Sequence, residues 1–118
     1  MVAAMSRVIS IATDFTRHPG PRYENDGPYS GEAFRKRILV PALEQAIRSG
    51  DKVTVWLDDV AGYGSSFLEE AFGGLIRTGF SKAQLDKHLV VAAKTNRFQH
   101  HALRAKKYIE EAASRNLH

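Results

Sequence analysis

The stretch GYGSSFLEEAFGGL, Gly62 to Leu75, decides how the rest of the chain is interpreted. It follows the apolar run VTVWLDDV, Val53 to Val60, and this order predicts a strand, a tight loop and a helix. Ser66 with Glu69 three residues later is typical of a capping box, so we expect Ser66 to cap the helix. Ser65 would then lie just outside the helix, with a free hydroxyl beside the positive end of the helix dipole.

A hydroxyl at the start of a helix suits phosphorylation, because free backbone amides and the helix dipole both stabilise an added phosphate. We therefore take Ser65 as a candidate phosphorylation site, with the adjacent Ser66 as a second candidate. The alternative is that Ser65 is only a small polar turn residue. Tyr63 stands between Gly62 and Gly64, and we expect it to be exposed at the loop tip as a contact residue. Its partial burial over the edge of the sheet is the alternative.

The composition fits one small globular domain that spans residues 1–118. The chain has 118 residues, of which 43% are hydrophobic and 25% are charged, and this is enough for a single core. It has no cysteine, which excludes disulfides and thiolate metal sites and is typical of the cytoplasm, where we expect the protein to reside. No apolar run approaches the roughly 20 residues that cross a bilayer, so we expect no membrane segment.

Strand-like and helical segments alternate along the chain, which predicts an α/β fold with a mostly parallel sheet covered by helices. We expect four strands, and we place the three long β-rich segments inside the sheet because both of their faces are apolar. A short strand near Arg22 and Tyr23 would pair with the first of them. The three β-rich segments are Ser6–Phe15, Asp51–Val60 and Leu89–Ala93. Four helical segments are expected. One begins after Ser30, one runs from Ser66 to about Arg77, a short one begins after Ser81, and the last runs from about Arg97 to Asn116.

Local signals mark where these helices begin and bend. Ser30 is a good N-cap, and Ser81 with Gln84 forms a second capping box. Pro41 removes one helical hydrogen bond and strains the preceding turn, so we expect a kink or two short helices that meet at Val40.

Two glycines, Gly73 and Gly74, lie inside the helix that follows the loop. Each costs roughly 1 kcal/mol there relative to alanine, so a reason for their presence is needed. We interpret them as places where the helix backbone packs closely against the sheet or another helix, rather than as a hinge.

Two segments of the chain together resemble a known family. The first is RYENDGPYSGEAFR, Arg22 to Arg35, and the second is SSFLEEAFGGL, Ser65 to Leu75. A strand, a loop with paired serines and an amphipathic helix resemble the signature region of STAS domains, the fold of the bacterial anti-sigma-factor antagonists. Taken together and in this order, the two segments are similar to a family of small bacterial STAS-like proteins. With the flanking strands the resemblance spans most of the chain, and it implies a STAS-like fold.

The resemblance also implies a regulatory function without catalysis. STAS antagonists bind a histidine-kinase-like ATPase, an anti-sigma-type kinase that also sequesters a transcription factor, and phosphorylation of a loop serine by this partner breaks the complex. On this chain the acceptor position falls on Ser65, with Ser66 next to it. Gly64 and Phe67 stand where antagonists tend to have Asp and Gly. The expected partner-binding residues are Arg22, Arg35, Gly62, Tyr63, Gly64 and Phe67.

No pattern of catalytic or metal-binding residues is apparent, so we expect neither an enzyme nor a cofactor. Asp58 and Asp59 follow a strand, but adjacent strand residues point to opposite faces and cannot easily share one Mg²⁺ ion. The stretch YGSSF lacks the G-x-S-x-G elbow of serine hydrolases, and GYGSSF lacks the spacing of a glycine-rich phosphate loop. His100 and His101 project in different directions from a helix and are poor co-ligands.

Positive charge is concentrated in the C-terminal third of the chain. Residues 87–118 contain seven Lys or Arg and two Glu, a net charge of +5, whereas the whole chain carries +4. Such a segment can attract an acidic partner, or it supports an alternative function as a nucleic-acid-binding accessory protein that uses the last helix. An ordinary solvated helix face is the remaining interpretation.

Overall fold

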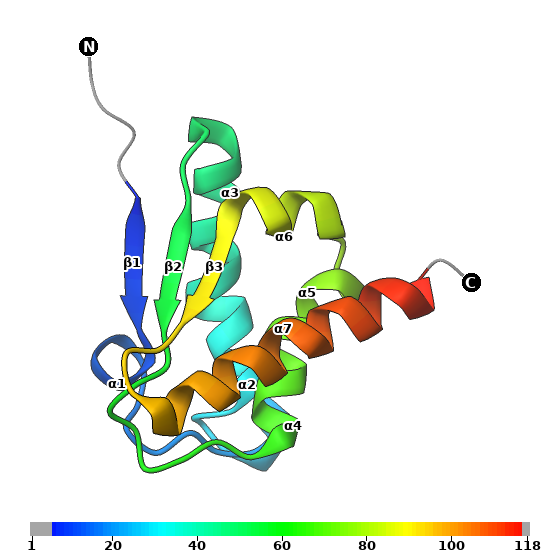
Figure 1. Ribbon diagram of the computed structural model, residues 1–118. Coiled ribbons are helices and arrows are strands. Elements are labelled where there is room, and N and C mark those ends of the chain that lie inside the picture. The colour runs from blue at the N-terminus through cyan, green and yellow to red at the C-terminus, as the bar shows by residue number, and fades with distance from the viewer. Residues whose placement is uncertain (1–5, 117–118) are drawn as a thin grey trace.

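The computed structural model describes residues 6–116, and its centre is a three-stranded parallel sheet (Figure 1). The middle strand pairs in parallel with both of its neighbours, which confirms the predicted parallel α/β arrangement. The last strand is also parallel, but it lies at an edge of the described sheet rather than inside it. In sheet order, the strands are β1 (Arg7–Ser10), β2 (Val53–Trp56) and β3 (Leu89–Ala92).

Helices follow each strand, and two of the helical runs each contain a π-helical turn. The run after the first long loop and the run after β2 lie side by side, and the last helix packs across the second of them. The helices of the N-terminal half are α1 (Ile11–Asp14), a 3-10 turn (Glu24–Asp26), α2 (Gly31–Phe34), a π-helical turn (Arg35–Leu39) and α3 (Val40–Ser49). Those of the C-terminal half are α4 (Ser65–Leu68), a π-helical turn (Glu69–Gly73), α5 (Gly74–Arg77), α6 (Lys82–His88) and α7 (Asn96–Asn116).

Among residues 6–116, the core lies on one face of the sheet. Ile9, Val55 and Val91 lie side by side in the strand register, and all three are buried. On the opposite face Val8 is 59% exposed and Val90 is 38% exposed. The expectation that helices cover the sheet is therefore wrong for this second face, because strand residues that are apolar on both sides need not be buried on both sides.

The expected fourth strand is absent from residues 6–116. The backbone near Arg22 instead serves the start of α2, because the carbonyl oxygens of Pro21 and Arg22 accept hydrogen bonds from the amides of Gly31 and Glu32, both at 3.0 Å. The first strand is also shorter than predicted and lies at an edge of the described sheet. It ends where the hydroxyl of Ser10 accepts from the amide of Thr13 at 3.3 Å and caps α1.

A π-helical turn joins α2 to α3, and α3 begins at Val40, where the sequence predicted a kink or the meeting of two short helices. The amide of Val40 donates to the carbonyl of Arg35, five residues earlier, instead of four. Pro41 follows directly and has no amide hydrogen to continue the regular pattern. The wider turn absorbs the clash between the proline ring and the preceding carbonyl groups without ending the helix.

The predicted helix starts at Ser30 and Ser81 are confirmed. The hydroxyl of Ser30 accepts from the amide of Ala33 at 3.0 Å. At α6 both halves of the capping box form, since Ser81 accepts from the Gln84 amide and the Gln84 side chain accepts from the Ser81 amide, each at 3.0 Å. Among residues 6–116, no helix has the length and apolar character needed to cross a membrane.

Candidate functional site: the loop before the second long helix

The loop from 58 to 64 leads from the carboxyl end of β2 to α4, at the end of the sheet where parallel α/β proteins place their sites (Figure 1). The helix begins at Ser65, one residue earlier than predicted, and its N-cap residue is Gly64, which has no side chain to cap it. The amide of Leu68 donates to the carbonyl of Gly64 at 3.4 Å. The capping box of Ser66 and Glu69 is therefore wrong, and Ser65 lies inside the first turn.

Long-range ion pairs explain why Glu69 does not cap the helix. Its carboxylate accepts from Arg22 at 2.6 Å and from Arg77 at 2.7 and 2.9 Å. The hydrogen bonds from Arg77, with those from Arg22, outweigh the effect of burial and hold the pKa of the Glu69 carboxyl below its ordinary value. A capping box is a local signal, and in this chain its acidic member, Glu69, is instead paired with Arg22, 47 positions earlier, and with Arg77, eight positions later.

The side chains of Ser65 and Ser66 consequently neither cap the helix nor hold another residue within residues 6–116. Ser65 and Ser66 are both exposed, and neither hydroxyl has a hydrogen-bond partner among the described residues. They occupy the first two positions of a helical run that continues to Arg77, where backbone amides lack helical acceptors and the dipole is positive. The physical basis for phosphate at this position is therefore retained, although the cap geometry differs.

Two serine substitutions distinguish the two helix starts. We expect Ser81→Ala to lower the free energy of unfolding by about 1 kcal/mol, because it removes a complete capping box. Ser66→Ala should change it by less than about 0.5 kcal/mol, because its hydroxyl caps nothing. Urea unfolding followed by circular dichroism gives both values. A loss at Ser66 equal to that at Ser81 would show that Ser66 does cap its helix.

Tyr63 is buried, so the prediction of an exposed contact residue is wrong. Only 9% of Tyr63 is exposed, and its hydroxyl donates to the carbonyl of Leu57 at 2.7 Å. Its ring lies 5.7 Å from Phe67 and 5.4 Å from His101 between centroids. Burial, with the nearby charge of Asp58, raises the pKa of Tyr63 well above its ordinary value. Tyr63 therefore anchors the loop to the core.

Phe67 is also fully buried and cannot serve as a direct partner contact. Next to the helix start, the accessible residues are Gly64 and the two serines that follow it, and Asp59 and Ala61 are exposed earlier in the loop. Nothing lies within 4 Å of a Cβ built on Gly62 or Gly64, so open space adjoins the backbone at both glycines. The loop is fixed at Ala61, whose amide donates to the Arg17 carbonyl at 2.8 Å and whose carbonyl accepts from Arg97 at 2.6 Å.

Arg35, a second expected contact residue, is held inside the protein. It is 5% exposed, and its Nη1 donates to the Glu70 carboxylate at 2.6 Å and to the Glu70 carbonyl at 2.7 Å. Arg22 is less buried and donates to Glu69 at 2.6 Å and to Glu70 at 3.3 Å. Arg35 thus pairs with Glu70, and a partner cannot reach it.

Glycines let the two family-like segments fit against each other. A Cβ on Gly31 would collide with the Phe67 carbonyl oxygen, and one on Gly74 would collide with the Arg35 guanidinium. A Cβ on Gly73 would meet the Glu69 carboxylate and, at 3.3 Å, a carbonyl oxygen of α7. The predicted close packing at Gly73 and Gly74 is confirmed. Much of the two segments therefore serves to lock two helices together.

Two exposed aromatic residues near this end of the molecule were missed by the sequence reasoning. Tyr23 is 48% exposed and Tyr29 is 49% exposed, both on the long loop before α2. The Tyr29 ring lies 5.7 Å from Phe15, which lies 6.4 Å from Phe67, so the loop reaches the start of α4. Their signal in the sequence is their place inside the first family-like segment, where no apolar periodicity buries them.

The Asp58 carboxylate has a structural role at the end of the sheet. Its carboxylate accepts from the amides of Lys94 and Thr95, at 2.9 and 3.0 Å, and from the Thr95 hydroxyl at 3.0 Å, and so fixes the start of α7. Asp59 is exposed, with a positive φ of 72°. Within residues 6–116, no cluster of three or more His, Asp or Glu side chains has the geometry to hold a metal ion.

The Asp58 contacts predict a pH dependence of stability. Burial disfavours its ionised form, but the hydrogen bonds from Lys94 and Thr95 outweigh burial and lower the pKa of the Asp58 carboxyl. Its stabilising effect is therefore complete above its unfolded pKa, roughly 3.9, and is lost as the pH falls through the lower folded value. Asp58→Ala should lower the unfolding free energy at neutral pH by about 2 kcal/mol, and less in acid. An equal loss at pH 7 and pH 2.5 in urea unfolding would contradict this assignment.

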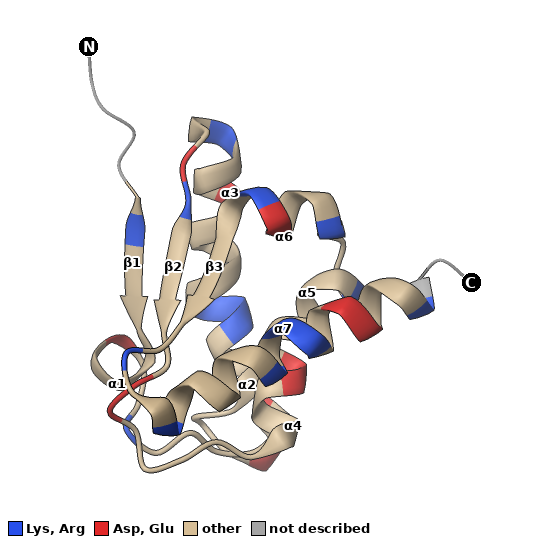
Figure 2. Cartoon of the chain, viewed as in Figure 1, with Lys and Arg blue, Asp and Glu red and all other residues tan. Residues whose placement is uncertain are grey.

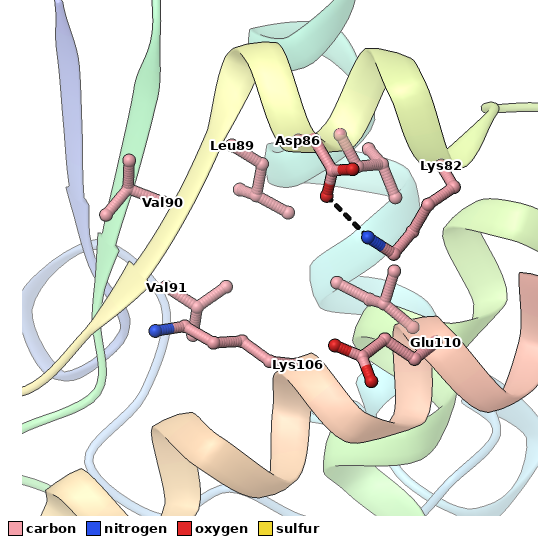
Figure 3. A pocket seen from close by; sticks show the side chains of 9 residues that line it. Lys82, Asp86, Leu89, Val90, Val91, Lys106 and Glu110 are labelled. Carbon is pink, nitrogen blue, oxygen red and sulfur yellow. Dashed lines mark hydrogen bonds and ion pairs between the residues drawn. The ribbon is translucent and has the colours of Figure 1, made fainter.

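The hollow in Figure 3 lies elsewhere, between α6, β3 and α7, with a volume of about 290 Å³. Leu89 and Val91 line it, and Lys82 pairs with Asp86 at 2.6 Å along its α6 wall. The lining includes no serine, threonine or histidine, and Glu110, whose carboxylate forms no ion pair within residues 6–116, is exposed. We therefore place the candidate site at the serine loop rather than in this hollow.

Comparison with known proteins agrees with this architecture. Residues 30–96 match a STAS-like domain of unknown function (DUF4325), and because this is more than half of the chain, the protein belongs to that family. The match contains the start of α2, the serine loop and both elements of the Arg35–Glu70 pair. No curated protein and no solved structure gave a significant match.

Proposed function

We propose that this chain is a regulatory protein-binding domain that uses the surface around Gly64, Ser65 and Ser66 to bind a histidine-kinase-like ATPase. It acts without catalysis of its own, and Ser65 is its control point. The partner class comes from the resemblance to anti-sigma-factor antagonists, whose partner modifies a loop serine at the corresponding place. The observation that carries the proposal is the exposed serine pair in the first helical turn, which has no structural task among residues 6–116.

The revised contact surface differs from the one that the sequence predicted. Tyr63 and Phe67 support the loop from inside, and Arg35 is buried against Glu70, so these residues act on partner binding only through the shape of the surface. The aromatic contacts with the partner are instead the exposed rings of Tyr23 and Tyr29. Aromatic residues are the type that most often anchors protein interfaces.

Phosphorylation of Ser65 provides the switch. A phosphate adds a charge of about −1.5 to −2 at neutral pH, and the helix that begins at Ser65 tolerates it through its dipole and free amides. A partner packed against the same turn would have to bury that charge without a counterion, which weakens the complex strongly. The fold is therefore preserved while the complex dissociates.

A capture experiment with matched variants tests this proposal. We expect wild type and Ser65→Ala to retain the same ATPase from extracts of the native host, and Ser65→Asp to lose it while its circular dichroism spectrum is unchanged. Ser114→Asp is the control, because Ser114 is exposed near the other end of α7, about 25 Å along the helix from Arg97. If Ser65→Asp captures the ATPase in the same yield as Ser114→Asp, Ser65 is not the control point.

The alternative function is nucleic-acid binding through α7. It is favoured by the sequence from 87 to 109, which contains no Asp or Glu. Contacts with several phosphates would make binding fall steeply with salt, whereas a protein partner anchored by apolar groups is less sensitive. We rank it second because carboxylates return at Glu110 and Glu111 and no nucleic-acid recognition motif is present.

A further inference from the structure

The outer face of α7 carries the most exposed large apolar side chain among residues 6–116. Leu103 is 67% exposed, although the helix buries its opposite side, including Ala102 and Ala105, in the core. On a helix the side chains three and four positions away surround a residue. For Leu103 these neighbours are Gln99, His100, Lys106 and Lys107, and all four are exposed.

The charged residues around Leu103, before Glu110, are all basic. No Asp or Glu occurs from 87 to 109, and Figure 2 shows Lys and Arg along the first part of α7, with acidic residues only nearer its C-terminal end. Within residues 6–116, no carboxylate lies within 4.0 Å of the charged nitrogens of Lys94, Arg97, Arg104, Lys106 or Lys107. The ion pairs of the described chain are formed by other cations, so the charge on this face is not neutralised internally.

The first turns of α7, where the basic face begins, lie against the loop that leads to Ser65. Arg97 Nη2 donates to the carbonyl of Ala61 at 2.6 Å, and the His101 ring lies 5.4 Å from the Tyr63 ring. Both contacts join the first turns of α7 to the loop that leads to Ser65. One partner can therefore cover the serine turn and the basic face together.

We infer that the outer face of α7 binds an acidic protein segment that places an apolar side chain over Leu103. This inference deepens the proposed function and rests on it, because the segment belongs to the same partner that contacts the serine turn. The carboxylates of the segment match Lys106, Lys107 and Arg97, which have no carboxylate partners in residues 6–116. Its apolar residue packs on Leu103 and removes it from water, so apolar burial adds to the charge complementarity of this surface.

The chemistry of the face favours a protein over the other polyanions. Contacts to nucleic-acid phosphates use cations and amides, and they leave no place for an exposed leucine at the centre of the basic patch. A membrane-surface helix needs a broad apolar face with several large residues, whereas α7 exposes Leu103 alone among its described large apolar side chains. An acidic segment with one apolar anchor satisfies both features.

Site-specific photocrosslinking in the native host identifies what covers Leu103. The full chain carries p-benzoylphenylalanine in place of Leu103, and a matched control carries it in place of Gln45, an exposed residue of α3. We expect the probe at 103, but not at 45, to attach to one protein, and mass spectrometry to locate the attachment in a segment rich in Asp and Glu. Adding Lys106→Glu and Lys107→Glu should reduce the yield at least five-fold, with the fold intact by circular dichroism.

Each other outcome overturns the inference. Attachment to nucleic acid, to lipid or to a protein segment without acidic residues would identify a different occupant, and a yield unchanged by charge reversal would exclude charge complementarity. No attachment above the control at 45 would show an uncovered face. If Ser65→Asp releases the ATPase but the probe at 103 never attaches to it, the inference fails and the proposed function stands. If the probe at 103 attaches to the ATPase but Ser65→Asp leaves capture and attachment unchanged, the control by Ser65 fails and the assignment of the α7 face stands.

Discussion

Replacing Glu70 with alanine is expected to lower the free energy of unfolding by about 3–5 kcal/mol. Glu70 is 7% exposed and Arg35 is 5% exposed, so the variant would leave a buried guanidinium without its carboxylate. The Glu70 backbone carbonyl would remain as an acceptor, but a carbonyl does not neutralise the charge. The π-helical turn that holds Glu70 and the α2–α3 run that holds Arg35 would separate or admit water.

Asp86→Ala is the matched control for this prediction. Asp86 also forms an ion pair, with Lys82 at 2.6 Å, but its side chain is 63% exposed. Exposed pairs contribute little, so its loss should be within about 0.5 kcal/mol. Both values come from urea unfolding at neutral pH. Similar losses for the two variants would mean that the Arg35–Glu70 pair does not hold the helices together.

Replacing Gly31 with alanine is expected to lower the free energy of unfolding by about 2–3 kcal/mol, the range typical of overpacking. The added methyl group would collide with the backbone carbonyl oxygen of Phe67, which cannot rotate away as a side chain would. The starts of α2 and α4 would then move apart, and the serine turn would move with them. A gain in helix propensity from alanine, at most about 1 kcal/mol, is too small to offset the collision.

Gly62→Ala is the control for the glycine variant, because nothing lies within 4 Å of a Cβ at that position. It should leave stability unchanged within about 0.5 kcal/mol. Comparison of the two variants by thermal and urea unfolding separates the effect of close approach from the general effect of replacing glycine. Equal stability of Gly31→Ala and wild type would show that the two helices are not in tight contact.

Local signals in the sequence predicted the features whose cause is also local. The caps at Ser30 and Ser81 and the disruption before Pro41 depend on atoms within one helical turn, and all three are confirmed. The close packing of Gly73 and Gly74 was also inferred correctly, because glycine inside a helix needs a packing reason.

The predictions that were wrong concern features that depend on residues far apart in the chain. The predicted capping box of Ser66 does not form, because Arg22, more than forty positions earlier, pairs with Glu69 at 2.6 Å. Tyr63 looked exposed between two glycines, but the loop folds back and its hydroxyl reaches the Leu57 carbonyl. The uncovered face of the sheet follows from where the helices pack, and the apolar pattern of a single strand does not contain that information.

The central claim is that the charge state of Ser65 controls a protein complex without changing the fold. The most direct test is the affinity of the captured, purified ATPase for the chain with phosphoserine incorporated at 65, measured by calorimetry beside unmodified protein and protein with phosphoserine at 114. The account predicts that phosphoserine at 65 weakens binding at least 100-fold, equivalent to about 2.7 kcal/mol, and that phosphoserine at 114 has no effect. Equal affinities for all three proteins would contradict it.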